Sequence, residues 1–239
     1  MYRAFLFLIN LYLILTIMKN IVLAFFALLA CYYCMNSAQV EEKEQRERFV
    51  RDSIERATFI QDSIERVEFV RDSIAKVEYN KSVITRCESK FSKITDEFSD
   101  IVWVRPKSAP KYRTSNAVYC YFGLTNGNAN IFRFVFQYYS EDWLFIRNMI
   151  FNIDGDNITI IPDMETDCGY GGMIWEWCDE YVGSIGNVSG EFIEKLANAE
   201  SVKVRMNGSQ YYDTRTLTST QINSIKDAYE YYLALGGEF

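Results

Sequence analysis

The sequence contains no histidine among its 239 residues. Histidine is the usual general base of serine and cysteine hydrolases and a common nitrogen ligand of zinc and iron. Catalytic triads and metal centres that depend on it are therefore excluded. The phosphate-binding glycine loop, the GxSxG nucleophile motif and HExxH are missing too. We therefore expect a protein that is not an enzyme, with no catalytic residue, no metal site and no cofactor.

Proline is scarce as well, since the chain has three prolines whereas aromatic residues make up 16% of it. Disordered segments show the opposite bias, with much proline and few aromatic residues. The chain is long enough for one domain of ordinary size together with an elongated element. We therefore expect a single folded core.

The N-terminal leader is poor in charge and holds two apolar runs, residues 4–17 and 21–30. The second run, preceded by Lys19, is typical of a signal peptide, and Met18 would then be the true start. Alternatively the two runs form one membrane anchor, because together they exceed the roughly 20 residues that cross a bilayer. Lys19 between the runs argues against the anchor. Either leader predicts an exported protein, located in the periplasm, at the outer membrane or outside the cell.

Two processing sites follow the second run, and the sequence leaves both open. The segment Leu28-Leu29-Ala30-Cys31 resembles a bacterial lipobox, which predicts a lipidated Cys31 and a membrane-held protein. The segment Asn36-Ser37-Ala38 before Gln39 instead fits an ordinary signal-peptidase site, which predicts a released protein.

Residues 39–98 contain neither proline nor glycine and include a ten-residue repeat, FVRDSIERAT at 49–58, FIQDSIERVE at 59–68, FVRDSIAKVE at 69–78 and a decayed copy at 79–88. Apolar positions step by four, three and three, which predicts a helix. Acid-before-base pairs such as Asp52 and Arg56 support an exposed helix at i, i+4 spacing. We therefore expect a charged helical spacer.

The ten-residue period falls about 80° short of three helical turns, so the apolar stripe drifts around the helix. Two interpretations stay open, an isolated rod or a strongly supercoiled homo-oligomer formed through this helix. The aromatic series Phe49, Phe59, Phe69 and Tyr79 favours a contact partner such as a second copy. Duplication of the repeat without selection for packing is the alternative explanation.

The repeated motif also carries a resemblance. The segments Arg51-Asp52-Ser53-Ile54 and Arg71-Asp72-Ser73-Ile74 follow a signal peptide. In this they resemble the charged helical spacers of exported envelope proteins from Bacteroides-like Gram-negative bacteria. The likeness covers residues 18–90. It implies a cell-envelope location and a stand-off role, and it brings no catalytic residue with it.

The remaining chain, residues 99–239, begins with alternating patterns that predict strands. Phe132, Phe134 and Phe136 share one face of such a strand. Hairpin-turn residues at Asn126-Gly127 and Asp154-Gly155 predict antiparallel pairing. The expected strands are 101–105, 117–124, 130–139, 143–153, 157–161, 174–182, 201–206 and 210–215.

Two helices are expected among these strands. Ser189 would cap one at 190–198, and Thr218 with Gln221 forms a capping box for the last one. The predicted fold is α+β, a long N-terminal helix followed by an antiparallel sheet with two helices packed on one face. The expected parts are the leader at 1–38, the spacer at 39–98 and a globular head at 99–239.

The head carries 18 acidic and 11 basic residues, a net charge of −7. Such a surface repels a phosphate backbone, so we expect no nucleic-acid partner. Its acids concentrate at 163–180, where aromatic residues alternate with them. Carboxylates beside aromatic faces suit a glycan, and oxygen ligands would also suit calcium. The candidate ligand-binding residues are Tyr170, Trp175, Glu176, Trp177 and Asp179.

Alternation places Trp175 and Trp177 on one face of a strand and Glu176 on the other. The ordinary interpretation is that the tryptophans face the core and the acids face solvent. Export would also make a disulfide feasible. Cys168 and Cys178 flank a glycine-rich segment and are the expected pair, and free buried thiols are the alternative.

These observations favour a non-enzymatic envelope protein whose spacer presents an acidic head to a protein or an envelope component. The membrane would be reached through the leader or through lipid on Cys31. The alternative is a head that binds or hydrolyses glycans with Trp175, Trp177 and nearby carboxylates. A third hypothesis is self-assembly of the head.

Overall fold

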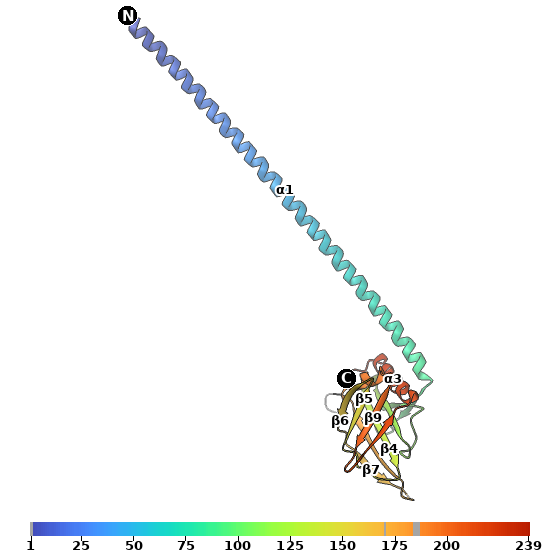
Figure 1. Cartoon of the computed structure of the whole chain (residues 1–239). Helices are drawn as coiled ribbons and strands as arrows, with labels where there is room; N and C mark the ends of the chain where they lie inside the picture. Colours follow the sequence, from blue (N-terminus) through green and yellow to red (C-terminus); the bar gives the residue numbers. More distant parts are fainter. Residues whose placement is uncertain (1, 170, 184–186) are drawn as a thin grey trace. The chain divides into compact units, whose positions relative to one another are not determined.

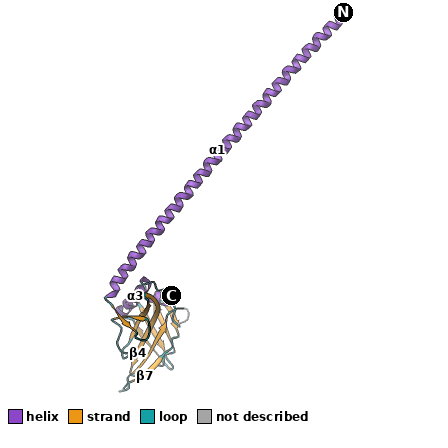
Figure 2. Cartoon of the chain, turned by 180° about the vertical axis from the view of Figure 1, so that it is seen from behind, coloured by secondary structure: helices purple, strands orange, loops and turns teal. Residues whose placement is uncertain are grey.

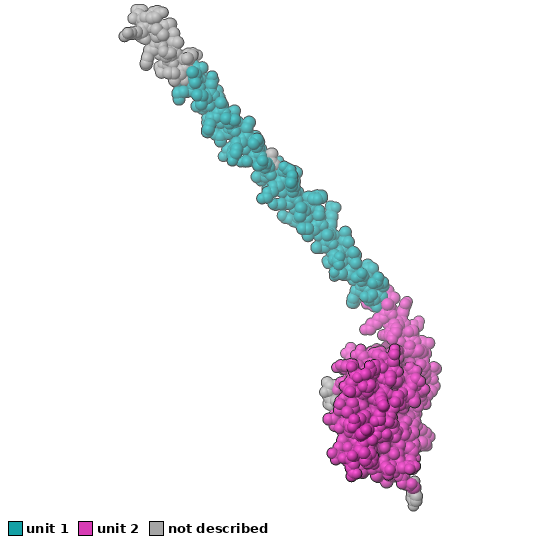
Figure 3. All heavy atoms as spheres, viewed as in Figure 1, with its two compact units in different colours: residues 1–72 teal, residues 73–239 magenta. Residues whose placement is uncertain are grey.

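The computed structural model describes residues 2–169, 171–183 and 187–239, with side chains left aside at 2–14 and 38. The chain divides into two compact units, Met1–Asp72 and Ser73–Phe239, which Figure 3 colours separately. The first unit is part of one helix, and the second holds all the strands that the structure describes.

Helix α1 runs from Tyr2 to Glu88 and contains the whole ten-residue repeat (Figure 1). An 18-residue apolar window in it has a mean hydropathy of 1.9 and is not buried, so its length and composition would allow it to cross a membrane. In the repeat, Phe49 and Phe59 are 74% and 73% exposed. The predicted helix over the repeat is confirmed. Its apolar stripe is solvent-exposed from Phe49 to Val77, whereas Val83 and Cys87 of the decayed copy are buried in the core.

The second unit, which includes the head, contains two antiparallel sheets (Figure 2). Sheet A has the order β1 (Phe91–Thr95), β2 (Ile101–Pro106), β3 (Ala117–Thr125), β4 (Asn128–Ser140), β8 (Ile174–Tyr181) and β7 (Glu165–Cys168). Sheet B has the order β10 (Tyr212–Thr216), β9 (Val202–Asn207), β5 (Asn148–Ile153) and β6 (Asp156–Ile160). Together with its helices this confirms the α+β prediction, with the expected antiparallel strands divided between two sheets.

The tight turns form where the sequence predicts them. Asn126 and Gly127, with φ of 53° and 83°, join β3 to β4, and Asp154 and Gly155, with φ of 50° and 105°, join β5 to β6. Both turns need left-handed backbone at two successive residues, which asparagine, aspartate and glycine adopt most easily.

The core lies between the two sheets, on the inner face of sheet A. Helices α2 (Gly190–Ala197) and α3 (Ser219–Ala234) also cover this face. The Phe134 ring of β4 lies 6.2 Å from Phe151 of sheet B and 5.6 Å from Phe192 of α2, measured between ring centroids. Phe122 of β3 lies 5.5 Å from Tyr231 of α3. The Ser189 cap and the Thr218 capping box both form as predicted.

The last part of the expected helical spacer differs from the prediction. Helix α1 ends at Glu88, and residues 91–95 form edge strand β1 of sheet A. The cause is tertiary: Phe91 is 5% exposed, and its ring centroid lies 5.5 Å from that of Tyr231 and 6.4 Å from that of Phe122. Burial of this ring therefore decides the conformation of a segment without helix breakers.

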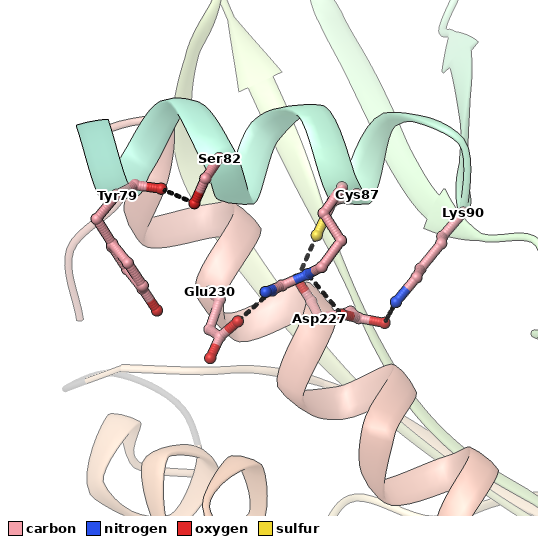
Figure 4. Close-up of polar contacts among 7 residues, drawn as sticks. Tyr79, Ser82, Cys87, Lys90, Asp227 and Glu230 are labelled. Carbon is pink, nitrogen blue, oxygen red and sulfur yellow. Dashed lines mark hydrogen bonds and ion pairs between the residues drawn. The ribbon is translucent and has the colours of Figure 1, made fainter. Parts of the chain in front are cut away.

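Charged residues hold the last turns of α1 against α3 within the second unit (Figure 4). Lys90 Nζ lies 2.7 Å from Asp227 Oδ2, and Arg86 pairs with both Asp227 and Glu230. The thiol of Cys87 donates to the carbonyl oxygen of Asp227 at 3.7 Å. The two acids are only 14% and 17% exposed, so these ion pairs are better shielded than ordinary surface pairs.

The crossover segment, residues 141–147, carries the chain from sheet A to sheet B. The sequence predicts a strand from Trp143, whereas strand β5 begins at Asn148. The backbone N–H groups of Leu144, Phe145 and Ile146 donate to the buried carboxylate of Glu176 instead of to a neighbouring strand. Phe145 has φ of 54°, a left-handed conformation that ends any extended pairing there.

Candidate functional site

The outer face of sheet A, which presents Tyr119, Val135, Gln137 and Trp177, carries a pocket of about 670 Å³. We call it the outer-face pocket. Strands β3, β4 and β8 form its floor, and residues 111–114, which link β2 to β3, contribute to its wall. Its aromatic lining consists of Trp103, Tyr112, Tyr119, Tyr121, Trp175 and Trp177. Its volume lies within the roughly 300–1,000 Å³ typical of small-molecule sites.

The structure reverses the predicted orientation of β8. Trp175, Trp177 and Asp179 line the outer-face pocket, and Glu176 is fully buried on the core side. The alternation itself is as predicted. The orientation follows from the register with β4, because Cys178 lies opposite the core residue Phe136 and the odd-numbered residues of β8 must then face outward.

Glu176 is therefore not a ligand-binding residue of this pocket. Its Oε1 accepts the N–H groups of Leu144 and Phe145 at 2.7 and 2.8 Å, and its Oε2 accepts that of Ile146 at 2.8 Å. Glu180, also buried on this side, accepts the N–H of Asp163. The two carboxylates that were expected to face solvent instead stabilise irregular backbone inside the head.

Three of the five candidate ligand-binding residues are brought together. Trp175, Trp177 and Asp179 line the same pocket, and Tyr170 lies outside the described residues. Asp179 is already engaged, since Oδ2 accepts the hydroxyl of Tyr121 at 2.7 Å and Oδ1 accepts Nε of Arg133 at 2.8 Å. Burial raises the pKa of the Tyr121 hydroxyl and the Asp179 carboxylate raises it further, so this hydroxyl remains a donor.

Positive charge in the outer-face pocket is the feature that sequence reasoning missed. Arg105, Lys111 and Arg113 line it, from a segment distant in sequence from the acidic one. The guanidinium carbon of Arg113 lies 3.9 Å from the centroid of the Trp177 ring, a cation–π contact. The cluster of bases at 105–113, in an otherwise acidic head, was the available signal.

The floor of the pocket holds a pair of buried polar side chains. Gln137 of β4 and Trp177 of β8 are cross-strand partners and are 4% and 5% exposed. Among the described residues, Gln137 Oε1 and Trp177 Nε1 have no hydrogen-bond partner. A buried polar atom without a partner costs about 1–3 kcal/mol, and native proteins hold few of them. Such a pair at the floor of a pocket points to a ligand.

The predicted disulfide between Cys168 and Cys178 is wrong, since both are free thiols. Cys168 lies opposite Ile174, and Cys178 is four residues further along β8. Four residues of strand span about 13 Å, whereas Cα atoms joined by a disulfide lie within about 7 Å. In addition Cys178 is fully buried on the core side of sheet A while Cys168 is exposed.

Alkylation should separate these thiols. Burial raises the pKa of the Cys120 and Cys178 thiols, so they carry even less thiolate at pH 8 than an ordinary cysteine. We expect iodoacetamide to label Cys168 in the folded protein and to leave Cys120 and Cys178 unlabelled, as read by peptide mass spectrometry. All three should react in guanidinium. Equal labelling of the three in the folded protein would contradict the packing of this sheet.

The outer-face pocket has few carboxylates for acid–base chemistry. Its carboxylates are Asp167 and Asp179, of which Asp179 is held by Tyr121 and Arg133. In the part of the chain that the structure describes, no group of three or more metal-ligating side chains is placed to hold a metal ion.

The chain matches no protein-family model. Comparisons with curated proteins and with solved structures find no significant similarity.

Proposed function

We propose that this chain is a non-enzymatic, exported cell-envelope protein whose head binds an envelope component in the outer-face pocket. The observation that carries the proposal is the pocket itself, a hollow of about 670 Å³ lined by aromatic and cationic side chains. It lies on the face of sheet A opposite the main core, where Tyr119 and Val135 belong to a second, small buried cluster while Trp103 and Trp175 stay partly exposed. Partly exposed tryptophan together with exposed arginine on such a surface is typical of recognition sites.

The residues 39–88 of α1 act in this proposal as a spacer. Their apolar repeat positions from Phe49 to Val77 are solvent-exposed, and i, i+4 ion pairs such as Glu42 with Arg46 support an exposed helix. The apolar window in α1 supports either a signal peptide or a membrane anchor. The resemblance of the repeat to envelope spacers points to the same location.

The alternative function is a head that binds or hydrolyses glycans. Of these two, glycan binding is better supported, because Trp175 and Trp177 lie in one pocket. Glycoside hydrolysis is less well supported. It needs two free carboxyl groups across one cleft, and Asp179 has both oxygens engaged while Glu176 lies on the core side.

Export is tested at the mature N-terminus. The full chain is expressed in a Gram-negative host, the cells are fractionated, and the N-terminal peptide is identified by mass spectrometry. We expect an envelope-associated protein that starts at acylated Cys31 or at Gln39. A Cys31→Ala variant separates the two outcomes, because it removes the acylated N-terminal peptide if Cys31 is lipidated and leaves a chain that starts at Gln39 unchanged. An unprocessed chain in the cytosolic fraction would overturn the proposal.

A further inference from the structure

The two unpartnered atoms of the floor residues are buried in this structure, and they select the group that can bind them once a covering side chain such as Arg113 moves. Trp177 Nε1 is a donor only, and Gln137 Oε1 is an acceptor only. As cross-strand partners these side chains are neighbours on one face of sheet A. A carboxylate could not donate to Oε1, and an ammonium group could not accept from Nε1. A hydroxyl group does both, so the floor fits a polyhydroxylated ligand.

The aromatic lining of the pocket fits the same ligand. Trp103 and Tyr121 form an edge-to-face pair at 5.4 Å between centroids, and half-buried Trp175 lines the same pocket. A sugar ring presents apolar C–H groups on its faces and hydroxyl groups at its edge. Aromatic side chains offer a matching apolar surface with polar atoms at the ring edge.

The charges of the pocket favour a ligand that carries an acidic group. Arg105, Lys111 and Arg113 line the pocket together with Asp167 and Asp179, and the charge of Asp179 is compensated by its ion pair with Arg133. A positive charge therefore remains in the pocket of a head whose net charge is −7. Arg113 is exposed and lies on the Trp177 ring, so a ligand can displace its flexible side chain and pair with the guanidinium beside the floor.

We infer that the outer-face pocket binds a saccharide that carries an anionic group. Gln137 and Trp177 hold one of its hydroxyl groups, the aromatic lining contacts its ring, and Arg113 with Lys111 pairs with its carboxylate or phosphate. This inference rests on the proposed binding function of the pocket and names the class of its ligand.

The test titrates the full-length chain in amine-oxide micelles, which contain no sugar, and follows tryptophan fluorescence and calorimetry at low salt. The probes are tri-galacturonate, the neutral galactose trimer and glucose 6-phosphate. We expect an acidic sugar to bind at least about tenfold more tightly than the neutral trimer. Arg113→Ala should lower the affinity for the acidic sugar by about tenfold. The matched control Lys226→Ala, an exposed cation on α3, should leave it unchanged.

A second variant tests the floor, since Trp177→Phe keeps an aromatic ring and removes the indole N–H donor along with one ring of the indole. We expect about a fivefold loss of affinity for the acidic sugar with an unchanged circular dichroism spectrum. Binding of glucose 6-phosphate in place of tri-galacturonate supports the inference and identifies the anion as phosphate. Equal affinity for acidic and neutral trimers, or no effect of Arg113→Ala, overturns it.

Failure of the inference and failure of the proposed function remain distinguishable. The same proteins are incubated with the polysaccharide, peptidoglycan and lipid fractions of a Gram-negative envelope. If no sugar probe binds but one fraction binds the wild type and not Trp177→Phe, the acidic-sugar inference is overturned and a binding pocket stands. If neither probe nor fraction binds the wild type, both are overturned.

Discussion

Replacing Glu176 with alanine is expected to lower the free energy of unfolding of the head by about 4 kcal/mol, since breaking a buried charged network costs roughly 3–5 kcal/mol. The carboxylate is fully buried and accepts three backbone N–H groups from the crossover segment. Alanine would leave these donors without partners and would open a cavity. A loss of this size is a large part of the roughly 5–15 kcal/mol that stabilises a typical domain.

The measurement is urea unfolding followed by tryptophan fluorescence, which reports on the head because all four tryptophans belong to it. Glu165→Ala on β7 is the matched control, because that side chain is exposed, and it should change the stability by less than about 0.5 kcal/mol. The stability of Glu176→Gln should lie between those of the two alanine variants. Its amide oxygen can still accept backbone N–H groups, whereas its NH₂ group would face a backbone N–H donor. If Glu176→Ala were no less stable than Glu165→Ala, the assignment of Glu176 as a structural carboxylate would be wrong.

Replacing Gly208 with alanine is expected to cost about 2–4 kcal/mol, through overpacking against backbone that cannot move. A Cβ atom at this position would lie 2.1 Å from the carbonyl oxygen of Leu144 and 2.7 Å from its Cδ1 atom. Leu144 is fixed on both sides, because its N–H donates to Glu176 and its carbonyl accepts the N–H of Ser209 at 3.1 Å. The clash must therefore move the β9–β10 turn away from the crossover segment.

Gly127→Ala is the control that separates steric overlap from backbone strain. Gly127 has φ of 83° and no atom within 4 Å of an added Cβ, so alanine there suffers only the conformational cost of about 1–2 kcal/mol. Gly208 is not in the left-handed region, so its cost comes from the overlap alone. Urea unfolding should give Gly208→Ala a lower free energy of unfolding than Gly127→Ala. The reverse order would contradict the packing at Leu144.

Local patterns predicted the elements whose conformation depends on nearby residues. The repeat helix, the Thr218 capping box and the turns at Asn126-Gly127 and Asp154-Gly155 all form where expected. They could be predicted because hydrogen bonds of helices, caps and tight turns join residues close in sequence. Strand β1 and the crossover segment could not be predicted, because their conformations are determined by Phe122, Tyr231 and Glu176 from distant elements.

The sequence by itself determined the alternation of β8, namely that Trp175 and Trp177 share one face and Glu176 lies on the other. Only the tertiary structure decided which face is buried. A two-residue period defines two faces of a strand but does not show which one packs against the core. Pairing of Cys178 with Phe136 of β4 places Glu176 and Glu180 on the buried face. The same pairing placed Trp177 beside Gln137, and sheet order brought Arg113 over it. The candidate site therefore depends on contacts between distant segments, which a residue pattern within one segment does not contain.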